Sequence, residues 1–292
     1  MVIGQIVVPR GFVTDYIELT KPRIVVMLLV TALGGMFLAE RGTPDLQLIL
    51  LVLGGGALAA GGANALNHCI DRDLDRQMCR TRNRPGAQGR IQPWQALTFG
   101  IGLNIVAAAM LGALVNPLSA ALTLSATLFY VFVYTIALKR TTAQNVVIGG
   151  AAGAFPPLIG WTAVTGALAL PPVYLFVIIF VWTPPHFWAL SLLLKDDYYR
   201  AGVPMLPVVA GVAETKKTII RYSFALVASS FLPLMITSVG WIYLATTSAL
   251  GIGFIYFAWR LRYHDDVLGA RALYLYSLAY LGLLFLAIMM DS

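Results

Sequence analysis

Residues 64–85, NALNHCIDRDLDRQMCRTRNRP, form a charged segment in a strongly apolar chain. Three aspartates and five arginines lie within fourteen of these residues, although charged residues make up only 11% of the chain. On a helix, residues three or four apart share one face. Four polar side chains follow that spacing: Asn64, Asn67, Asp71 and Asp75. Carboxylate and amide oxygens suit Mg²⁺, which usually takes one or two carboxylates and shares its other positions with water and substrate phosphates.

Arginines surround the predicted polar face. A guanidinium group binds phosphate oxygens in pairs through its planar fork. The segment therefore predicts a site for a magnesium-bound phosphate or diphosphate. The alternative is a solvated helix end, where Asp and Arg pair for solubility and topology. The arginines are Arg72, Arg76, Arg80, Arg82 and Arg84.

A second charged helix end lies in residues 184–208, PPHFWALSLLLKDDYYRAGVPMLPV. Its charged residues are Lys195, Asp196, Asp197 and Arg200. Asp197 follows His186 by eleven residues, or about three helical turns, so we expect both on one face with His186 deeper in the membrane. Two carboxylate sets facing one diphosphate could hold two Mg²⁺ ions.

Two further basic stretches are expected on the same, inner side of the membrane. LKRTTAQNVVIGG, residues 138–150, supplies Lys139, Arg140 and Asn145. ELTKPRI, residues 18–24, supplies Lys21 and Arg23. Each could equally be a loop that follows the rule that positive charge stays inside.

The elements that must position these residues are membrane-spanning helices. Hydrophobic residues make up 59% of the chain, and the mean hydropathy is +0.80. A spanning helix takes roughly 20 apolar residues. Nine runs qualify, which predicts an all-α polytopic membrane protein: 24–39, 46–70, 95–114, 117–138, 146–166, 172–194, 219–239, 241–258 and 272–290.

Charge position predicts the orientation of these helices. With the N-terminus inside, the inner segments are 1–23, 71–94, 139–145, 195–218 and 259–271, and they hold nineteen of the twenty Lys and Arg residues, allowing for ragged helix ends. Only Arg41 falls outside, so the rule favours a cytoplasmic N-terminus and an outer C-terminus in a bacterial inner membrane. We expect one domain over residues 1–292, contact with membrane lipid and no nucleic-acid partner. No cleavable signal peptide is expected, and the two cysteines are expected to be free thiols.

The substrate implied by a diphosphate site in a membrane bundle has an anionic head and an apolar tail, as isoprenyl diphosphates do. Five glycines in GGGALAAGGANALN allow close helix packing or a groove. Aromatic side chains could face a carbocation, or simply pack: Tyr130, Tyr134, Trp161, Trp182, Phe187 and Trp188. A transporter is the non-enzyme alternative, favoured only by the Pro184–Pro185 break, because nearly all charge lies at helix ends rather than at the midplane.

The motifs above resemble those of the UbiA-type intramembrane prenyltransferases. NALNHCIDRDLDRQMCRTRNRP, LKRTTAQNVVIGGAAGAFPPLIGW and TPPHFWALSLLLKDDYYRAGVPMLPV are most similar to the branch that prenylates haem. The resemblance implies nine helices around a central cavity that opens to the cytoplasm. It implies farnesyl diphosphate as donor, haem B as acceptor, Mg²⁺ as cofactor, and haem O formed by attack of a vinyl group and capture of water. It also implies haem A synthase or oxidase assembly factors as candidate partners.

The resemblance also assigns roles to residues. It implies metal binding and catalysis by Asn67, Asp71 and Asp75, with Asp196 or Asp197 nearby. It implies diphosphate binding by Arg72, Arg76, Arg82, Arg84, Lys139, Arg140, Lys195 and Arg200. The haem or prenyl pocket is expected to include His186, Asn64, Asn145, Tyr130, Tyr134 and Trp182.

His186 is the one ionisable residue well within a predicted span. Our hypothesis is that it contacts haem, either as an iron ligand or by orienting a propionate. The alternative is a hydrogen-bonded structural histidine. His68 could likewise serve the site or pack at the helix end.

Two departures from the wider family leave further alternatives open. The first motif has Asn67-His68 where many members have Asn-Asp, and Asp196 and Asp197 are adjacent rather than four apart. The number of Mg²⁺ ions therefore stays at one or two. Both departures resemble the haem-prenylating branch and count against an aromatic-acid acceptor. From spacing and composition alone, a quinone precursor or a chlorin remains the alternative acceptor.

Overall fold

The structure is a computed structural model, and it describes residues 11–235, 239–263 and 267–292. The described part is helical and contains no strand. Within it, nine helices are long and apolar enough to cross a membrane, as the sequence predicts. They are Pro22–Glu40, Leu46–Ile70, Pro93–Leu114, Pro117–Leu138, Asn145–Thr165, Leu170–Leu193, Gly211–Met235, Trp241–Tyr263 and Leu268–Asp291.

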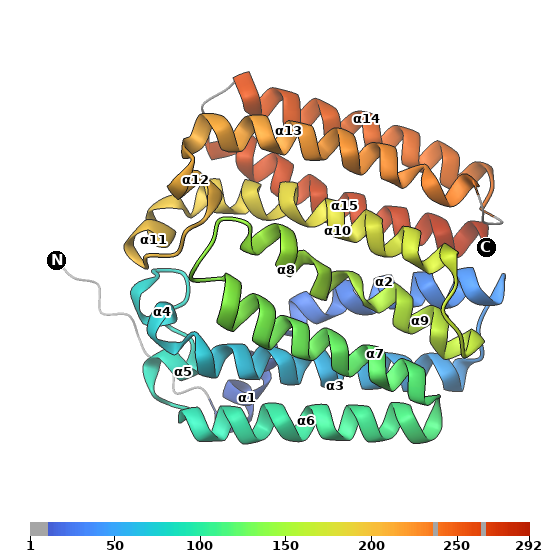
Figure 1. Cartoon of the computed structure of the whole chain (residues 1–292), viewed down its shortest axis with the longest axis horizontal. Helices are drawn as coiled ribbons and strands as arrows, with labels where there is room; N and C mark the ends of the chain where they lie inside the picture. The colour runs from blue at the N-terminus through green and yellow to red at the C-terminus, as the bar shows by residue number, and fades with distance from the viewer. Residues whose placement is uncertain (1–10, 236–238, 264–266) are drawn as a thin grey trace.

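Several spans are built from more than one element. The single-helix spans are α2 (Pro22–Glu40), α3 (Leu46–Ile70), α6 (Pro93–Leu114), α10 (Leu170–Leu193), α14 (Trp241–Tyr263) and α15 (Val267–Asp291). The compound spans are α7 (Pro117–Leu128) with the π-helix η1 (Phe129–Leu138), α8 (Asn145–Ala154) with α9 (Pro156–Thr165), and α13 (Gly211–Ser230) with the 3₁₀ helix η2 (Leu232–Met235). The spans run side by side in Figure 1.

The seventh span begins eight residues before its predicted start at 219. Its first turns carry Lys216, Lys217 and Arg221, which sequence hydropathy assigned to or near a loop. Charged residues are compatible with the end of a span because long basic side chains reach back to the membrane surface. The predicted inner segment 195–218 is therefore shorter than expected.

The charged segments form short helices that gather at one end of the bundle, on the left in Figure 1. They are α4 (Arg72–Gln77), α5 (Pro85–Gln88), α11 (Lys195–Arg200) and α12 (Leu206–Val209), and α1 (Phe12–Thr20) precedes the first span. A separate hydrophobic cluster holds the two charged loops together through Leu74, Met78, Val146, Tyr198, Ala201, Val203 and Met205. The two predicted motifs thus meet, although 120 residues separate Asp75 from Lys195.

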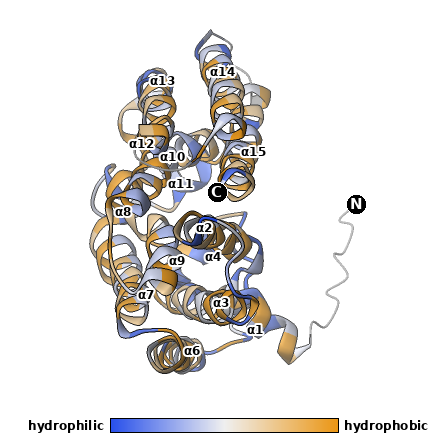
Figure 2. Cartoon of the chain, turned by 90° about the vertical axis from the view of Figure 1, so that its right-hand side faces the viewer, coloured by the Kyte–Doolittle hydropathy of each residue, from blue (hydrophilic) through white to orange (hydrophobic). Residues whose placement is uncertain are grey.

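Glycines bring α3 and α6 into backbone contact. A Cβ atom on Gly62 would lie 2.7 Å from the carbonyl oxygen of Gly100, and one on Gly100 would lie 2.8 Å from that of Gly62. Lipid tails are as apolar as leucine, so close packing of this kind, rather than exclusion of water, holds spans together. Both views place α3 and α6 at the opposite side of the assembly from α13 and α14, with α2 and α9 between them (Figures 1 and 2).

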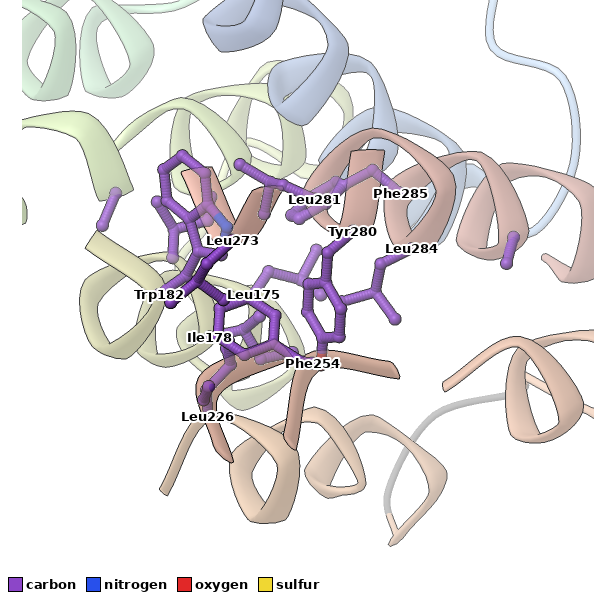
Figure 3. Packing of buried hydrophobic residues seen from close by; sticks show 14 of the residues in the cluster. Leu175, Ile178, Trp182, Leu226, Phe254, Leu273, Tyr280, Leu281, Leu284 and Phe285 are labelled. Carbon is purple, nitrogen blue, oxygen red and sulfur yellow. The ribbon is translucent and has the colours of Figure 1, made fainter. Parts of the chain in front are cut away.

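The main core lies where α10 and α15 meet α13 and α14 (Figure 3). Ile178 and Leu226 are fully buried there, as are Phe254 and Phe285. Tyr280 adds a polar contact, because its hydroxyl lies 2.7 Å from the Ser230 hydroxyl. This core fixes α10, which continues into the second charged motif, against the C-terminal helix. The central cavity stays a prediction.

Candidate active site

Asp71 lies at the junction between α3 and α4 and is only 1% exposed. The junction preserves the helical register, since the Asp71 amide donates to Asn67 O at 2.9 Å and the Asp75 amide donates to Asp71 O at 2.8 Å. Asp71 Oδ2 accepts from Lys139 Nζ and, at 2.7 Å, from Asn67 Nδ2. The spacing of four residues therefore brings the Asn67 and Asp71 side chains into contact and keeps Asp75 in the same helical register, even though the helix breaks.

Asp75 pairs with an arginine from its own loop. Arg84 Nη1 lies 2.8 Å and 3.1 Å from the two carboxylate oxygens of Asp75. Thr81 Oγ1 donates to the Asp75 carbonyl at 3.1 Å, which folds the loop back over α4. Arg84 thus lies at the carboxylate face, as the sequence predicts.

Lys21 joins this cluster from the turn between α1 and α2. Its backbone is left-handed, with φ of 51°, and its Nζ donates to Asn67 Oδ1 at 3.0 Å. Asn64 Nδ2 donates to the carbonyl oxygen of Thr20 at 3.1 Å and so fixes the same turn. Burial, and then the neighbouring cations Arg84 and Lys139, lower the pKa of Lys21 to about 7. Sequence reasoning noted Lys21 but did not assign it to the site.

The π-helix η1 and the residue that follows it, Lys139, supply contacts to Asn67 and Asp71. In it the backbone bonds reach five residues back, as from the Lys139 amide to Tyr134 O at 2.9 Å. Thr135 Oγ1 accepts from Asn67 Nδ2 at 3.2 Å. Long π-helices are rare and cluster at functional sites. Tyr130 and Tyr134 stack on this element with ring centroids 5.5 Å apart.

Arg140 lies at the rim of the cluster. It donates to Asp73 at 2.6 Å and 2.7 Å, and its Nη2 is 3.8 Å from Asp71 Oδ1. The hydrogen bond from Arg140 lowers the pKa of the Asp73 carboxyl below its usual value. Sequence reasoning missed Asp73, because its position falls off the face defined by Asn67 and Asp71.

The second motif contributes one enclosed carboxylate. Asp197 is buried, and its Oδ2 accepts from the Arg80 amide at 3.3 Å. Asp196 is exposed, and Lys195 is half-buried. Arg200 is exposed and has its Nη1 4.0 Å from Cys79 Sγ. The structure therefore brings Asp197 toward the first loop and leaves Asp196 in the open.

Two arginines predicted to bind diphosphate have backbone partners instead. Arg72 Nε donates to Gly86 O at 2.9 Å, and Arg76 Nε donates to Ala87 O at 3.0 Å. These bonds hold α5 against α4. Arg82 is exposed, and its carbonyl accepts from Gln88. The sequence could not separate these arginines from Arg84, because all of them lie in one short segment.

His186 and Trp182 lie in the α10–α15 interface. Trp182 Nε1 donates to Ser277 O at 2.8 Å, and His186 Nδ1 is 2.6 Å from Ser277 Oγ. Asp197 instead contacts the first charged loop. The expectation that His186 and Asp197 face one place is therefore not supported by their contacts, because the helix breaks at Leu194 between them.

Four buried polar side-chain atoms near the cluster have no hydrogen-bond partner in the described part of the chain: Asp71 Oδ1, Asn145 Oδ1 and both ring nitrogens of His68. Buried polar atoms are normally paired. Arg84, Lys139 and Arg140 balance the three negative charges of Asp71, Asp73 and Asp75, and Lys21, whose pKa is lowered to about 7, adds a partial positive charge. The arrangement can bind an anion whose oxygens meet the cations, while a free carboxylate oxygen remains for a metal or a donor.

Comparison with known proteins decides the family. The profile of the UbiA prenyltransferase family matches residues 28–288. The chain belongs to the UbiA prenyltransferase family. The match includes seven of the nine described spans completely, most of the first and last spans, and both charged motifs, which are therefore features of a UbiA protein rather than of an unrelated helical bundle.

Two curated relatives and one solved structure illustrate the likeness. The chain is 50% identical to protoheme IX farnesyltransferase of Gloeobacter violaceus over 288 residues, covering 98% of this chain and 94% of that protein. It is 48% identical to the protein of the same name from a Roseiflexus species over 95% of this chain, but it spans only 52% of that protein's length. A UbiA homolog from Archaeoglobus fulgidus bound to DMAPP and Mg²⁺ has the same fold, with a TM-score of 0.67, 18% identity, and coverage of 94% of this chain and 99% of that one.

Proposed function

We propose that the chain is a haem O synthase, a protohaem IX farnesyltransferase that transfers the farnesyl group of farnesyl diphosphate to haem B. The observation that carries this proposal is the 50% identity, over nearly the whole length of both proteins, to a relative named protoheme IX farnesyltransferase. The cation–carboxylate cluster around Asp71 supports it, because a diphosphate leaving group needs such a partner.

The donor set fits Mg²⁺ in part. Asn67, Asp71 and Asp75 offer the oxygen ligands that Mg²⁺ prefers, and Asp71 Oδ1 has no hydrogen bond. Within the described ranges, however, no three His, Cys, Asp or Glu side chains gather closely enough to hold a metal. These residues would therefore supply part of a coordination shell that diphosphate and water complete. Bound Mg²⁺ would neutralise charge on the diphosphate; a solved UbiA homolog bound to DMAPP and Mg²⁺ supports this cofactor.

The chain's cations would act on the leaving group. Lys139 and Arg84 each bind a carboxylate of the cluster, and a bound diphosphate would compete with these carboxylates for them. As the bond between C1 of the farnesyl group and oxygen breaks, its electron pair goes to the diphosphate, whose growing charge these side chains stabilise. The vinyl group of haem B then forms the new carbon–carbon bond. Water adds to the resulting cation and releases a proton, which leaves a hydroxyl group on haem O.

The same proposal includes place and organisation. The nine apolar helices among the described residues make the chain an integral membrane protein. We propose one prenyltransferase domain over residues 1–292, in the bacterial inner membrane, with the N-terminus and the charged loops cytoplasmic and the C-terminus outside. The positions of the basic residues support this orientation. Haem A synthase and oxidase assembly factors would be its partners.

The test is to incubate the purified chain in detergent with haem B, farnesyl diphosphate and Mg²⁺. Haem O should appear by mass spectrometry and disappear when a chelator is added. Parallel reactions offer a quinone precursor or a chlorin in place of haem B. A prenylated quinone precursor or chlorin without haem O would contradict the acceptor, and failure of every acceptor with folded protein would favour a transporter.

A further inference from the structure

His186 is held firmly within a membrane span. Its imidazole stacks on Trp182 with ring centroids 4.3 Å apart, and on Tyr274 with ring centroids 4.8 Å apart. The interplanar angles are 19° and 27°, so both aromatic rings lie nearly parallel to the imidazole. Trp182 is itself anchored, since its Nε1 donates to the carbonyl oxygen of Ser277 on α15. The position and plane of the imidazole are therefore fixed by neighbours on two helices.

Hydrogen bonding assigns the tautomer of His186. Ser277 Oγ donates to the carbonyl oxygen of Tyr274 at 2.7 Å. A hydroxyl group carries one hydrogen, so Oγ can only accept in its 2.6 Å contact with His186 Nδ1. Nδ1 is therefore the donor. The ring lies in an apolar span with no salt-bridge partner in the described part of the chain, so the neutral form is favoured and Nε2 keeps its lone pair.

The lone pair on Nε2 is unused. Nε2 has no hydrogen-bond partner among the described residues. The residue is buried, with 6% exposure, but Nε2 is not one of the fully enclosed unpaired atoms, so this nitrogen keeps some accessible surface. An unpaired acceptor in a membrane interior is costly and is often functional. The lone pair of Nε2 can accept a hydrogen bond or bind a metal ion. A propionate group is itself a hydrogen-bond acceptor, so it cannot donate to Nε2. Of the two roles considered for His186, iron ligation therefore fits and orientation of a propionate does not.

We infer that His186 Nε2 is an axial ligand of the haem iron when the acceptor is bound, and that Ser277 orients it. This inference rests on the proposed function, because it names how the haem acceptor is held. A ligating histidine normally donates its other ring nitrogen to a neighbouring oxygen, which fixes its tautomer and orientation. Ser277 Oγ fills that position here. Iron ligation would fix the porphyrin in the bundle and so determine which vinyl group meets the farnesyl group.

The test is a titration of the full chain in detergent with haem B alone, without farnesyl diphosphate. Absorption and resonance Raman spectra of the ferrous form report an iron–imidazole bond directly. The wild type should show that bond, His186→Gly should lose it, and added imidazole should restore it in His186→Gly. An unchanged iron–imidazole signal in His186→Gly, or none in the wild type, overturns the inference.

Two further variants keep the test decisive. Ser277→Ala should retain the iron–imidazole bond with a shifted stretching frequency and about tenfold weaker haem binding, because loss of such an outer partner typically costs 10–100-fold in affinity. His68→Gln, the matched variant at the other described buried histidine, should leave the spectrum unchanged. If His186→Gly does not fold, an unshifted frequency in Ser277→Ala overturns the inference.

The outcomes also separate the inference from the proposed function. Haem O formed by a wild-type protein that shows no iron–imidazole bond would remove the role of His186 and leave the farnesyl transfer standing. A folded wild-type protein that neither binds haem nor forms haem O would contradict both.

Discussion

Asp71 and Asp73 are two residues apart but have opposite surroundings. Asp71 is enclosed and held by Lys139 and Asn67, whereas the side chain of Asp73 is 58% exposed and pairs with Arg140 at the rim. An enclosed carboxylate that holds a cation in a fixed position contributes far more to catalysis than an exposed one. The two positions therefore form a matched pair for mutation.

Asp71→Asn should lower kcat/KM for haem O formation by about 10²–10³-fold, the usual effect of removing one preorganised electrostatic group. Asp73→Asn should change it by less than about threefold, because exposed ion pairs contribute little. Both rates are measured per amount of folded protein, checked by size-exclusion chromatography. Equal loss in the two variants would show that the enclosed carboxylate has no special role.

Arg84 and Arg72 form a second matched pair. Arg84 contacts the Asp75 carboxylate, whereas Arg72 donates to the Gly86 carbonyl. Arg84→Gln should raise the KM for farnesyl diphosphate by about tenfold or more, since a charge-assisted contact is worth roughly 1.5–3 kcal/mol. Arg72→Gln should instead lower the melting temperature and leave that KM unchanged in the protein that remains folded. If Arg72→Gln raised the KM for farnesyl diphosphate and Arg84→Gln did not, the prediction from sequence that Arg72 binds diphosphate would stand instead.

Sequence spacing predicted one face for Asn67, Asp71 and Asp75, and the contact between Asn67 and Asp71 agrees with it because the backbone bonds continue through the helix break. It did not place Lys21 in the cluster, since that contact joins residues 46 positions apart and depends on how the α1–α2 turn sits. The role of Thr135 was also invisible, because a π-helix has no clear signature in composition.

At the scale of the elements, two of the three glycines of α6 have different surroundings. A side chain on Gly100 would meet the Gly62 carbonyl and Leu66, whereas Gly102 has open space around it. Gly100→Leu should lower the free energy of unfolding by about 1–3 kcal/mol through overpacking, seen as a lower melting temperature in detergent. Gly102→Leu, which adds the same side chain two residues away from that contact, should leave the melting temperature unchanged. A similar fall in both would mean that α3 and α6 do not approach as described.

Element boundaries were predicted well where apolar runs end at loops and poorly where charge enters a helix. The third and fourth spans end as expected, but α13 begins at Gly211 because basic side chains are compatible with the end of a span. The sequence did not predict which helices pack against each other. In a chain that is apolar throughout, hydropathy hardly distinguishes residues that face lipid from residues that face protein.

At the scale of the whole molecule, the proposed orientation predicts which side of the membrane exposes Cys79. This residue is exposed beside the charged loops, and Cys69 is only partly buried, so Cys69→Ser leaves a single reporter. A membrane-impermeant maleimide should label Cys79 in inside-out vesicles and not in intact cells. The control is Gly42→Cys in a protein lacking both native cysteines, which places the reporter on the opposite side of the membrane. It should be labelled in intact cells and not in inside-out vesicles. Labelling of Cys79 in intact cells would reverse the topology.

The central claim is that the enclosed carboxylates and cations around Asp71 bind a prenyl diphosphate together with Mg²⁺. The most direct measurement is isothermal titration of farnesyl diphosphate into the purified chain without haem, with Mg²⁺ and with a chelator. We predict Mg²⁺-dependent binding that Asp71→Asn abolishes and Asp73→Asn retains. Binding of equal strength in the presence of the chelator, or unchanged binding by folded Asp71→Asn, would contradict the account.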